Sequence, residues 1–256
     1  MIHNRHFAAL LVTVVVATGQ FEENQLQTVQ GKYLRIYGSS GPGVPIKECA
    51  QLFSQYNGID VLVTSGPESD WTDRALQDAD LIYAGAEYVL AQFTQAHPGF
   101  IDLKTRTSLY ERPVGILVRK GNPRRIQSIS DLARPGIRHL DVVGSSQIAL
   151  WEDIAGLKHL IQAIQKNIIL TVQTSDQAFE KWRSMPGIDA WVTFESWYYR
   201  DKSVADLVQL PYEERMCRGT PIALTKGAKN RSLAMKFIEF LKSEQARAIF
   251  QKWGWE

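Results

Sequence analysis

Loops rich in serine and glycine follow several apolar stretches of the sequence. The clearest are Gly38-Ser39-Ser40-Gly41, Thr64-Ser65-Gly66 and Gly144-Ser145-Ser146-Gln147. Glycine lets the backbone approach a ligand closely, free N–H groups at a helix N-terminus favour negative charge, and hydroxyls donate further hydrogen bonds. The same residues can be simple caps and turns. Because such loops recur in both halves of the chain, they favour a binding site for a small oxyanion.

Residues for catalysis or metal binding are not grouped in this sequence. The serine-rich loops contain no histidine, and neither a Gly-x-Ser-x-Gly elbow nor a phosphate-binding loop occurs. His97 precedes a proline, His139 enters a predicted strand and His159 lies in a predicted helix, which indicates structural or surface roles. Cys49, Cys217 and the five histidines form no cluster at metal-ligand spacing. We therefore expect no catalytic residue, no metal and no cofactor.

Carboxylates and tryptophans also lie near the ends of predicted strands. A trio of carboxylates in these loops can bind a cation or an ammonium group, but solvated or capping carboxylates are the simpler interpretation. The tryptophans suit packing better than stacking on a ligand. The carboxylates are Glu68, Glu87 and Glu195, and the tryptophans are Trp71, Trp191 and Trp197.

The composition is that of an ordinary globular protein. The 256 residues include 29 Lys plus Arg and 27 Asp plus Glu, for a net charge of +2, and 45% are hydrophobic. No basic run is longer than the pair Arg124-Arg125, so the chain has no electrostatic footprint for a phosphate backbone. We expect no nucleic-acid partner.

The elements that position these loops alternate between strand and helix. Strand, short loop and helix occur three times in the first part of the chain and the same order recurs after residue 140, which indicates α/β sheets of mostly parallel strands. Helices are expected over 45–56 and 148–165, after Ser175 as an N-cap, and in two closing helices of which Ser243 caps the last and Gly254 ends it. The expected strands are 33–37, 59–63, 80–84, 114–118, 140–143, 168–172, 188–193 and 222–225.

The first residues resemble a secretory signal peptide. Arg5 precedes the apolar run 7–16, and the small residues Ala17 and Gly19 follow it. An uncleaved membrane anchor is the alternative. Crossing the hydrocarbon core of a bilayer takes about 20 apolar residues, however, and this run is too short. We expect cleavage near Gly19 and a periplasmic protein. An oxidising compartment permits a disulfide between Cys49 and Cys217, while a buried free thiol at Cys49 is the other alternative.

The mature chain divides into two lobes in this interpretation. The residues around Arg112-Pro113 are expected to cross into the second lobe, and those around Arg218-Gly219 to return. The expected divisions are a signal peptide over 1–19, a flexible arm over 20–31, lobe 1 over 32–113 plus 217–256, and lobe 2 over 114–216.

Nearly all of the mature sequence resembles a type II periplasmic solute-binding protein. It is most similar to the accessory colonization factor (AcfC) family, which is akin to molybdate- and sulfate-binding proteins. The resemblance implies a two-lobed α/β fold, each lobe a mostly parallel sheet flanked by helices, joined by two crossover segments with the ligand between them. The segments that carry it are Leu34 to Pro42, Gly66 to Trp71, Tyr110 to Pro113, Ile116 to Pro123, Leu150 to Gly156, Asp189 to Thr193 and Phe250 to Trp255.

Position within the family pattern assigns a ligand-binding set. Ser39-Ser40 stands where relatives are expected to have Pro-Gly, and Gly144-Ser145-Ser146-Gln147 where Gly-Ala-Gly-Gln is usual, so the ligand identity is open. Arg218, in the returning crossover, is assigned the cation. The other assigned residues are Ser39, Ser40, Glu68, Ser69 and Trp71 from lobe 1 and Ser145, Ser146, Gln147, Thr193 and Trp197 from lobe 2.

The sequence therefore predicts a non-enzymatic periplasmic receptor for a small anion. A sulfate- or molybdate-like oxyanion, an organosulfate or a small carboxylate fits the site, and the expected partner is a membrane transporter permease of the ABC type or a sensor. The resemblance implies a monomer. Two alternatives are an exported α/β hydrolase or transferase, and an adhesion or colonization module with a vestigial pocket. The absence of a base near Ser39 or Ser145 argues against the enzyme.

Overall fold

The computed structural model describes residues 33–256. The expected signal peptide over 1–19, its cleavage near Gly19 and the expected arm over 20–31 lie outside the described residues. Both cysteines are free thiols, and burial raises the pKa of Cys49 to about 12. Within the described part of the chain, no helix is long and apolar enough to cross a membrane.

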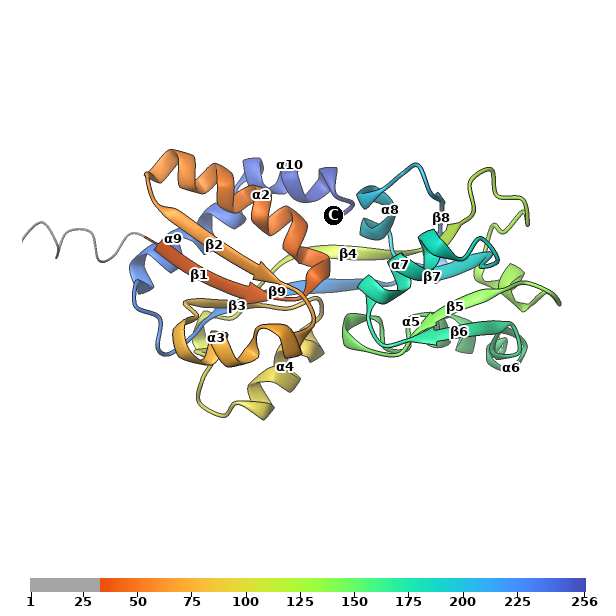
Figure 1. The fold of residues 1–256 in the computed structure, drawn as a ribbon, viewed down its shortest axis with the longest axis horizontal. Helices are drawn as coiled ribbons and strands as arrows, with labels where there is room; N and C mark the ends of the chain where they lie inside the picture. Colours follow the sequence, from red (N-terminus) through yellow and green to blue (C-terminus); the bar gives the residue numbers. More distant parts are fainter. Residues whose placement is uncertain (1–32) are drawn as a thin grey trace, which may run out of the picture. The chain divides into compact units, whose positions relative to one another are not determined.

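The strands form one nine-stranded mixed sheet (Figure 1), in the order β2-β1-β3-β9-β4-β7-β5-β6 with β8 beside β4. The pairs β1–β3, β5–β6 and β5–β7 are parallel, whereas β9 and β4 pair antiparallel to their neighbours. The strands are β1 (Tyr33–Gly38), β2 (Asp60–Ser65), β3 (Leu81–Tyr83), β4 (Thr107–Val118), β5 (His139–Val142), β6 (Ile168–Val172), β7 (Ala190–Phe194), β8 (Asp206–Gln209) and β9 (Cys217–Leu224).

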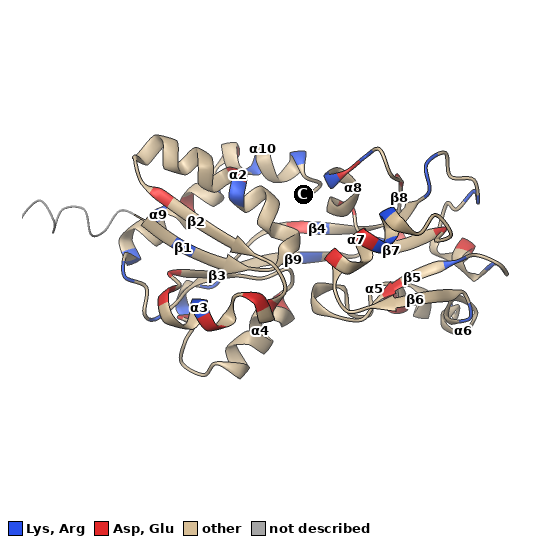
Figure 2. Cartoon of the chain, in the orientation of Figure 1, with Lys and Arg blue, Asp and Glu red and all other residues tan. Residues whose placement is uncertain are grey.

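Strand β4 belongs to both lobes. Its residues 107–113 pair with β9, and its residues 114–118 pair with β7. In the first register, Arg112 lies directly opposite Arg218 of β9. Two long antiparallel strands thus carry the chain between the lobes, and each places an arginine at the crossing. Figure 2 shows basic segments on both strands at this position.

Helices cover both faces of the sheet in lobe 1. Alternate side chains of a strand point to opposite faces, so Ile36 and Leu81 join one core and Tyr37 and Ile82 the other. Helices α2 (Ser40–Asn57), α9 (Arg231–Leu241) and α10 (Glu244–Lys252) pack on the first core, and α3 (Thr72–Asp78) and α4 (Glu87–Ala96) on the second (Figure 1). This is the expected α/β layering.

Lobe 2 has a separate core that runs from Val114 to Leu210. Its three largest buried side chains are Trp182, Trp191 and Trp197. The helices of this lobe are α5 (Leu150–Gly156), α6 (Ile161–Gln165), α7 (Ser175–Ser184) and α8 (Ser196–Arg200). The predicted two-lobed α/β fold with two crossover segments is confirmed by this arrangement and by the comparisons below.

Several element boundaries differ from the sequence prediction. The helix expected over 148–165 is two short helices, because the chain turns after Gly156 and His159 adopts a left-handed conformation with φ 57°. Strand β8 was not expected, and β4 and β9 begin earlier than predicted because they continue through the crossing. The N-cap of α7 is Thr174 rather than Ser175, since the Thr174 hydroxyl accepts from the Gln177 N–H at 3.2 Å.

Helix α2 begins at Ser40, five residues before the expected start at Pro45. Pro42 lies in its first turn, where the missing N–H is tolerated. Pro45 is further inside, so the carbonyl four residues earlier, that of Gly41, receives no helical hydrogen bond from it. That carbonyl lies within 3.4 Å of a guanidinium nitrogen of Arg200, at the end of α8 in lobe 2. Sequence rules would place Pro45 at the start of a helix. Inside α2 it instead leaves the Gly41 carbonyl free to accept a hydrogen bond from lobe 2.

Gly38 ends β1 and sets the position of the loop that follows. A Cβ on this residue would lie 2.3 Å from the Tyr83 carbonyl oxygen and 2.6 Å from its ring. We expect Gly38→Ala to lower the free energy of unfolding by about 1–3 kcal/mol, the usual cost of overpacking. Gly227→Ala is the control, since its Cβ would meet no atom within 4 Å. Equal midpoints of the two variants in denaturant unfolding would contradict this prediction.

Candidate ligand-binding site

A cavity of about 220 Å³ lies between the two lobes. Most of its wall comes from loops that follow the carboxyl ends of strands: β1 leads to Ser39, β2 to Glu68, β5 to Ser145 and β6 to Ser175. This is where α/β sheets bind ligands, because helix N-termini and free backbone N–H groups meet there. The lining residues are Ser39, Ser40, Gly41, Gly66, Pro67, Glu68, Trp71, Gln92, Arg112, Ser145, Ser146, Thr174, Ser175 and Asp176.

Arg112 is the buried cation of this cavity. Its side chain is 1% exposed, and its guanidinium carbon lies 3.5 Å from the centre of the Phe194 ring. Its Nη2 donates to the carbonyl of Gly85 at 2.5 Å and to Oγ of Ser146 at 3.0 Å. Among residues 33–256, its Nε has no hydrogen-bond partner and no carboxylate forms an ion pair with it. The charge is therefore buried without a counter-ion.

Burial governs the electrostatics of this guanidinium. Desolvation, with a smaller effect of the nearby Arg200, lowers the pKa of Arg112 to about 9, so it remains protonated at neutral pH. A buried charge without a partner is costly, and an anion in the cavity offsets that cost. The N-termini of α2, with 18 residues, and α7, with 10, also line the cavity and add positive potential. The site thus favours an anionic group beside Arg112.

Hydrogen bonds join the lobes around the cavity. The hydroxyl of Tyr88 in lobe 1 donates to the carbonyl of Ser145 in lobe 2 at 2.6 Å. Arg200 of lobe 2 donates to the carbonyl of Ser40 at 2.6 Å, and Ser40 Oγ bonds the carboxylate of Asp176. These contacts surround a cavity whose walls come from both lobes.

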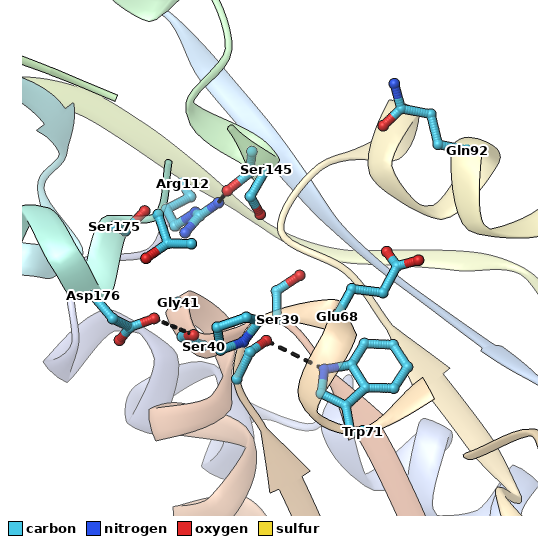
Figure 3. A pocket seen from close by; sticks show the side chains of 14 residues that line it. Ser39, Ser40, Gly41, Glu68, Trp71, Gln92, Arg112, Ser145, Ser175 and Asp176 are labelled. Atoms are coloured by element: carbon cyan, nitrogen blue, oxygen red, sulfur yellow. Dashed lines mark hydrogen bonds between the residues drawn. The ribbon is translucent and has the colours of Figure 1, made fainter. Parts of the chain in front are cut away.

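The remaining wall is acidic and amide-bearing. Figure 3 shows Glu68 and Gln92 on one side of the cavity, with Arg112, Ser175 and Asp176 on the other. Trp71 lies below Glu68, is 4% exposed, and donates from Nε1 to the Gly66 carbonyl at 3.2 Å. Because Trp71 also packs against Phe93 in the lobe 1 core, it forms a fixed wall of the cavity.

Six residues of the sequence-assigned set line the cavity together, and five lie outside it. Gln147 and Thr193 lie behind the wall: Gln147 Nε2 donates to Oγ of Ser175 and to Oγ1 of Thr193, each at 2.7 Å. They therefore support Ser175. The six lining residues are Ser39, Ser40, Glu68, Trp71, Ser145 and Ser146.

The three other assigned residues have partners elsewhere. Ser69 is exposed and donates to Asp70. Trp197 is buried in the lobe 2 core, where the guanidinium of Arg200 lies 3.9 Å from its ring centre. Arg218, assigned the cation from the sequence, forms an ion pair with Asp153 at 3.3 Å. The structure thus has Arg112 in the cavity where the sequence argument had Arg218.

Sequence reasoning missed the polar residues contributed by β4, α4 and the start of α7. The residue types at the start of α7 are those of a helix N-cap, so the sequence predicts capping and not ligand binding for Thr174, Ser175 and Asp176. The sequence places Arg112 only in a crossing segment, and no local signal marks it as buried, because arginine is rarely fully buried. The residues missed are Gln92, Arg112, Thr174, Ser175 and Asp176.

A two-lobed α/β receptor with an anion-suited cavity between its lobes is the class that this geometry defines. The chain belongs to the bacterial extracellular solute-binding proteins, whose family model matches residues 34–256. Curated proteins give no match to the sequence. The predicted relationship to type II solute-binding proteins is confirmed, and the family and the solved neighbours are binding proteins rather than enzymes.

Solved structures extend this relationship. L-phospholactate-bound PEB3 has 27% identity and a TM-score of 0.81, covering 87% of this chain and 99% of that one; PEB3 is from Campylobacter jejuni. The sulfate-binding protein SubI from Mycobacterium tuberculosis has 18% identity and a TM-score of 0.72, covering 88% and 86%. The periplasmic molybdate-binding protein of Azotobacter vinelandii has 15% identity and a TM-score of 0.69, covering 87% and 98%. The last two share the fold with this chain.

The unpaired charge of Arg112 predicts an unusual stability effect. Arg112→Met removes a desolvated cation, and this gain offsets much of the loss of its hydrogen bonds. We expect the free energy of unfolding without ligand to fall by less than about 1 kcal/mol. Arg138→Met is the matched comparison, because Arg138 pairs with the buried carboxylate of Asp189 at 2.9 Å. It should cost about 1.5–3 kcal/mol. Urea unfolding of both variants measures the difference, and a larger loss in Arg112→Met would refute the argument.

Proposed function

We propose that this protein is a periplasmic receptor that closes its two lobes over a small anion for transport or sensing. The observation that carries the proposal is the fully buried Arg112, which lines the cavity and has no carboxylate partner among residues 33–256. The binding residues proposed with it are Ser39, Ser40, Glu68, Trp71, Ser145 and Ser146.

Cavity size supports a small ligand. About 220 Å³ corresponds to roughly seven waters at their share of liquid volume, which suits a small organic anion and is too little for a peptide. The names of the related structures point the same way, since one has L-phospholactate bound and others bind sulfate or molybdate. Candidate ligands are therefore small phosphate or sulfate esters, free oxyanions and small carboxylates.

Closure follows from the division of the site between the lobes. An anion at Arg112 also meets hydroxyls of Ser39 in lobe 1 and of Ser145 and Ser175 in lobe 2, because all of them line one cavity. Only the closed form offers every contact at once, so binding shifts the hinge equilibrium towards it. The hinge proposed here is the pair β4 and β9, with lobe 1 over 32–113 plus 217–256 and lobe 2 over 114–216.

The proposal includes export and a partner. A signal peptide over 1–19 would deliver a monomer to the periplasm, where an ABC-type permease or a sensor would receive the loaded receptor. The membership of the chain in an extracellular solute-binding family supports this location.

Isothermal titration of the purified protein tests the function. We expect one anion among sulfate, molybdate, phosphate, phospholactate, organosulfates and acidic amino acids to bind one-to-one with a Kd of about 10 μM or tighter. Arg112→Met should weaken that binding at least about 100-fold, because charge-assisted hydrogen bonds to a buried guanidinium are lost. Arg218→Met should change it by less than about 5-fold, since Arg218 is already paired with Asp153 outside the cavity.

The opposite result for the two arginine variants would contradict the assignment of the cation. If Arg218→Met abolished binding and Arg112→Met preserved it, the cation assignment would be wrong. If no anion bound to a folded protein, the proposed function itself would fall.

A further inference from the structure

The cavity has opposite charges at its two ends. At one end the guanidinium of Arg112 is buried against Phe194, and the carboxylate of Glu68 lies on the opposite side, which also carries Gln92 (Figure 3). The anion-binding proposal uses only the first end. A carboxylate in the wall repels any ligand that is anionic along its whole length, so the second end restricts what the ligand can be.

Glu68 is the cavity carboxylate that has no partner. Within the described chain its side chain makes no hydrogen bond and no ion pair, and only its backbone carbonyl is engaged, by Trp71 and Thr72. Partial burial raises the pKa of Glu68, while the more distant His97 lowers it. Its charge is thus partly desolvated, and no protein group in residues 33–256 offsets it directly.

Asp176, the other carboxylate in the wall, is different. It accepts from Oγ of Ser40, and its second oxygen lies 3.8 Å from Arg200. Asp176 therefore serves the contact between the lobes, and its charge is compensated within the protein. Glu68 is therefore the carboxylate of the wall that is free to pair with a donor group of the ligand.

The size of the cavity agrees with a ligand that spans both ends. A tetrahedral oxyanion on Arg112 fills only part of a volume equal to about seven waters, which leaves room towards Glu68. A sulfate or molybdate ion cannot use that room, and a second carboxylate or phosphate would meet the Glu68 charge there. A group that donates hydrogen bonds, and best a cation, fits the acidic end.

We propose that the preferred ligand is a small zwitterion, with a phosphate, sulfonate or carboxylate group on Arg112 and an ammonium group against Glu68. This inference rests on the proposed function, because it requires that the cavity binds an anionic group at Arg112. The carboxamide of Gln92, on the same side of the cavity, is a further polar group of that wall. Glu68 is then a specificity residue, which favours zwitterions and disfavours dianions.

A matched series of sulfonates tests the contribution of the Glu68 end of the cavity alone. Taurine, isethionate and ethanesulfonate share one acid group and differ in carrying an ammonium group, a hydroxyl group or only a hydrogen atom on the second carbon. Titration should give taurine at least about 10-fold tighter binding than ethanesulfonate, with isethionate between them. O-phosphoethanolamine against ethyl phosphate repeats the comparison with a phosphate as the acid group.

Glu68→Gln should remove the preference while retaining the anion site. We expect the ratio of taurine to ethanesulfonate affinities to fall below about 3, with ethanesulfonate affinity unchanged or improved. Asp70→Asn is the matched control, because it removes the same charge from an exposed neighbour that does not line the cavity. It should leave the ratio as in the parent protein. Since Glu68 and Asp70 are both exposed, both variants are expected to fold, and their thermal unfolding verifies this.

The outcomes separate this inference from the function on which it rests. Equal binding of all three sulfonates, or binding of phosphate or sulfate with none of the zwitterions, would overturn the zwitterion assignment and leave the anion receptor intact. Preference for taurine that persists in Glu68→Gln would overturn the role of Glu68. If no probe and no simple oxyanion bound to the folded protein, both proposals would fail.

Discussion

The rest of the site depends on one positive charge that the fold buries without a counter-ion. Arg112 is fixed by the Gly85 carbonyl, the Ser146 hydroxyl and the face of Phe194, so three separate elements hold it. Desolvation raises the free energy of this buried charge. Among the described residues, no carboxylate pairs with it to lower that free energy. In the proposed function, a bound anion restores the balance. The uncompensated charge is then a source of affinity, because part of the desolvation cost is met in folding and not at binding.

The crossing strands explain why this charge lies where the lobes meet. The antiparallel register places Arg112 of β4 opposite Arg218 of β9. Cross-strand neighbours of like charge are unfavourable unless their fields are compensated. Asp153 of lobe 2 compensates Arg218, and the ligand site is the place where Arg112 can be compensated. The lobe closure proposed above would therefore change the surroundings of both arginines at once.

Sequence reasoning reached the fold more fully than the site. Apolar runs located β1, β3 and β6 to within a few residues, and the loops after β1 and β5 were recognised because serine and glycine at the start of a helix have a local signature. No local pattern distinguishes Arg112 from Arg218, since both are arginines in crossing strands. The difference is that Asp153, distant in sequence, reaches one and not the other. Likewise, Thr174 and Ser175 are both suitable caps by residue type; in the structure Thr174 caps α7, while the Ser175 hydroxyl accepts from Gln147.

Charges of both signs in one small cavity make selectivity a matter of charge position as well as of net charge. A site with Arg112 alone would bind every small anion and gain most from the most highly charged one. In the proposed site Glu68 changes that order, because each extra negative charge at its end meets repulsion from the carboxylate. Specificity against competitors is often achieved by such a repulsive element and not by added attraction. In this fold the attractive group is on a crossing strand and the repulsive group follows β2, so the two can change independently. The attraction and the repulsion of the proposed selectivity therefore reside on different elements of the two-lobed scaffold.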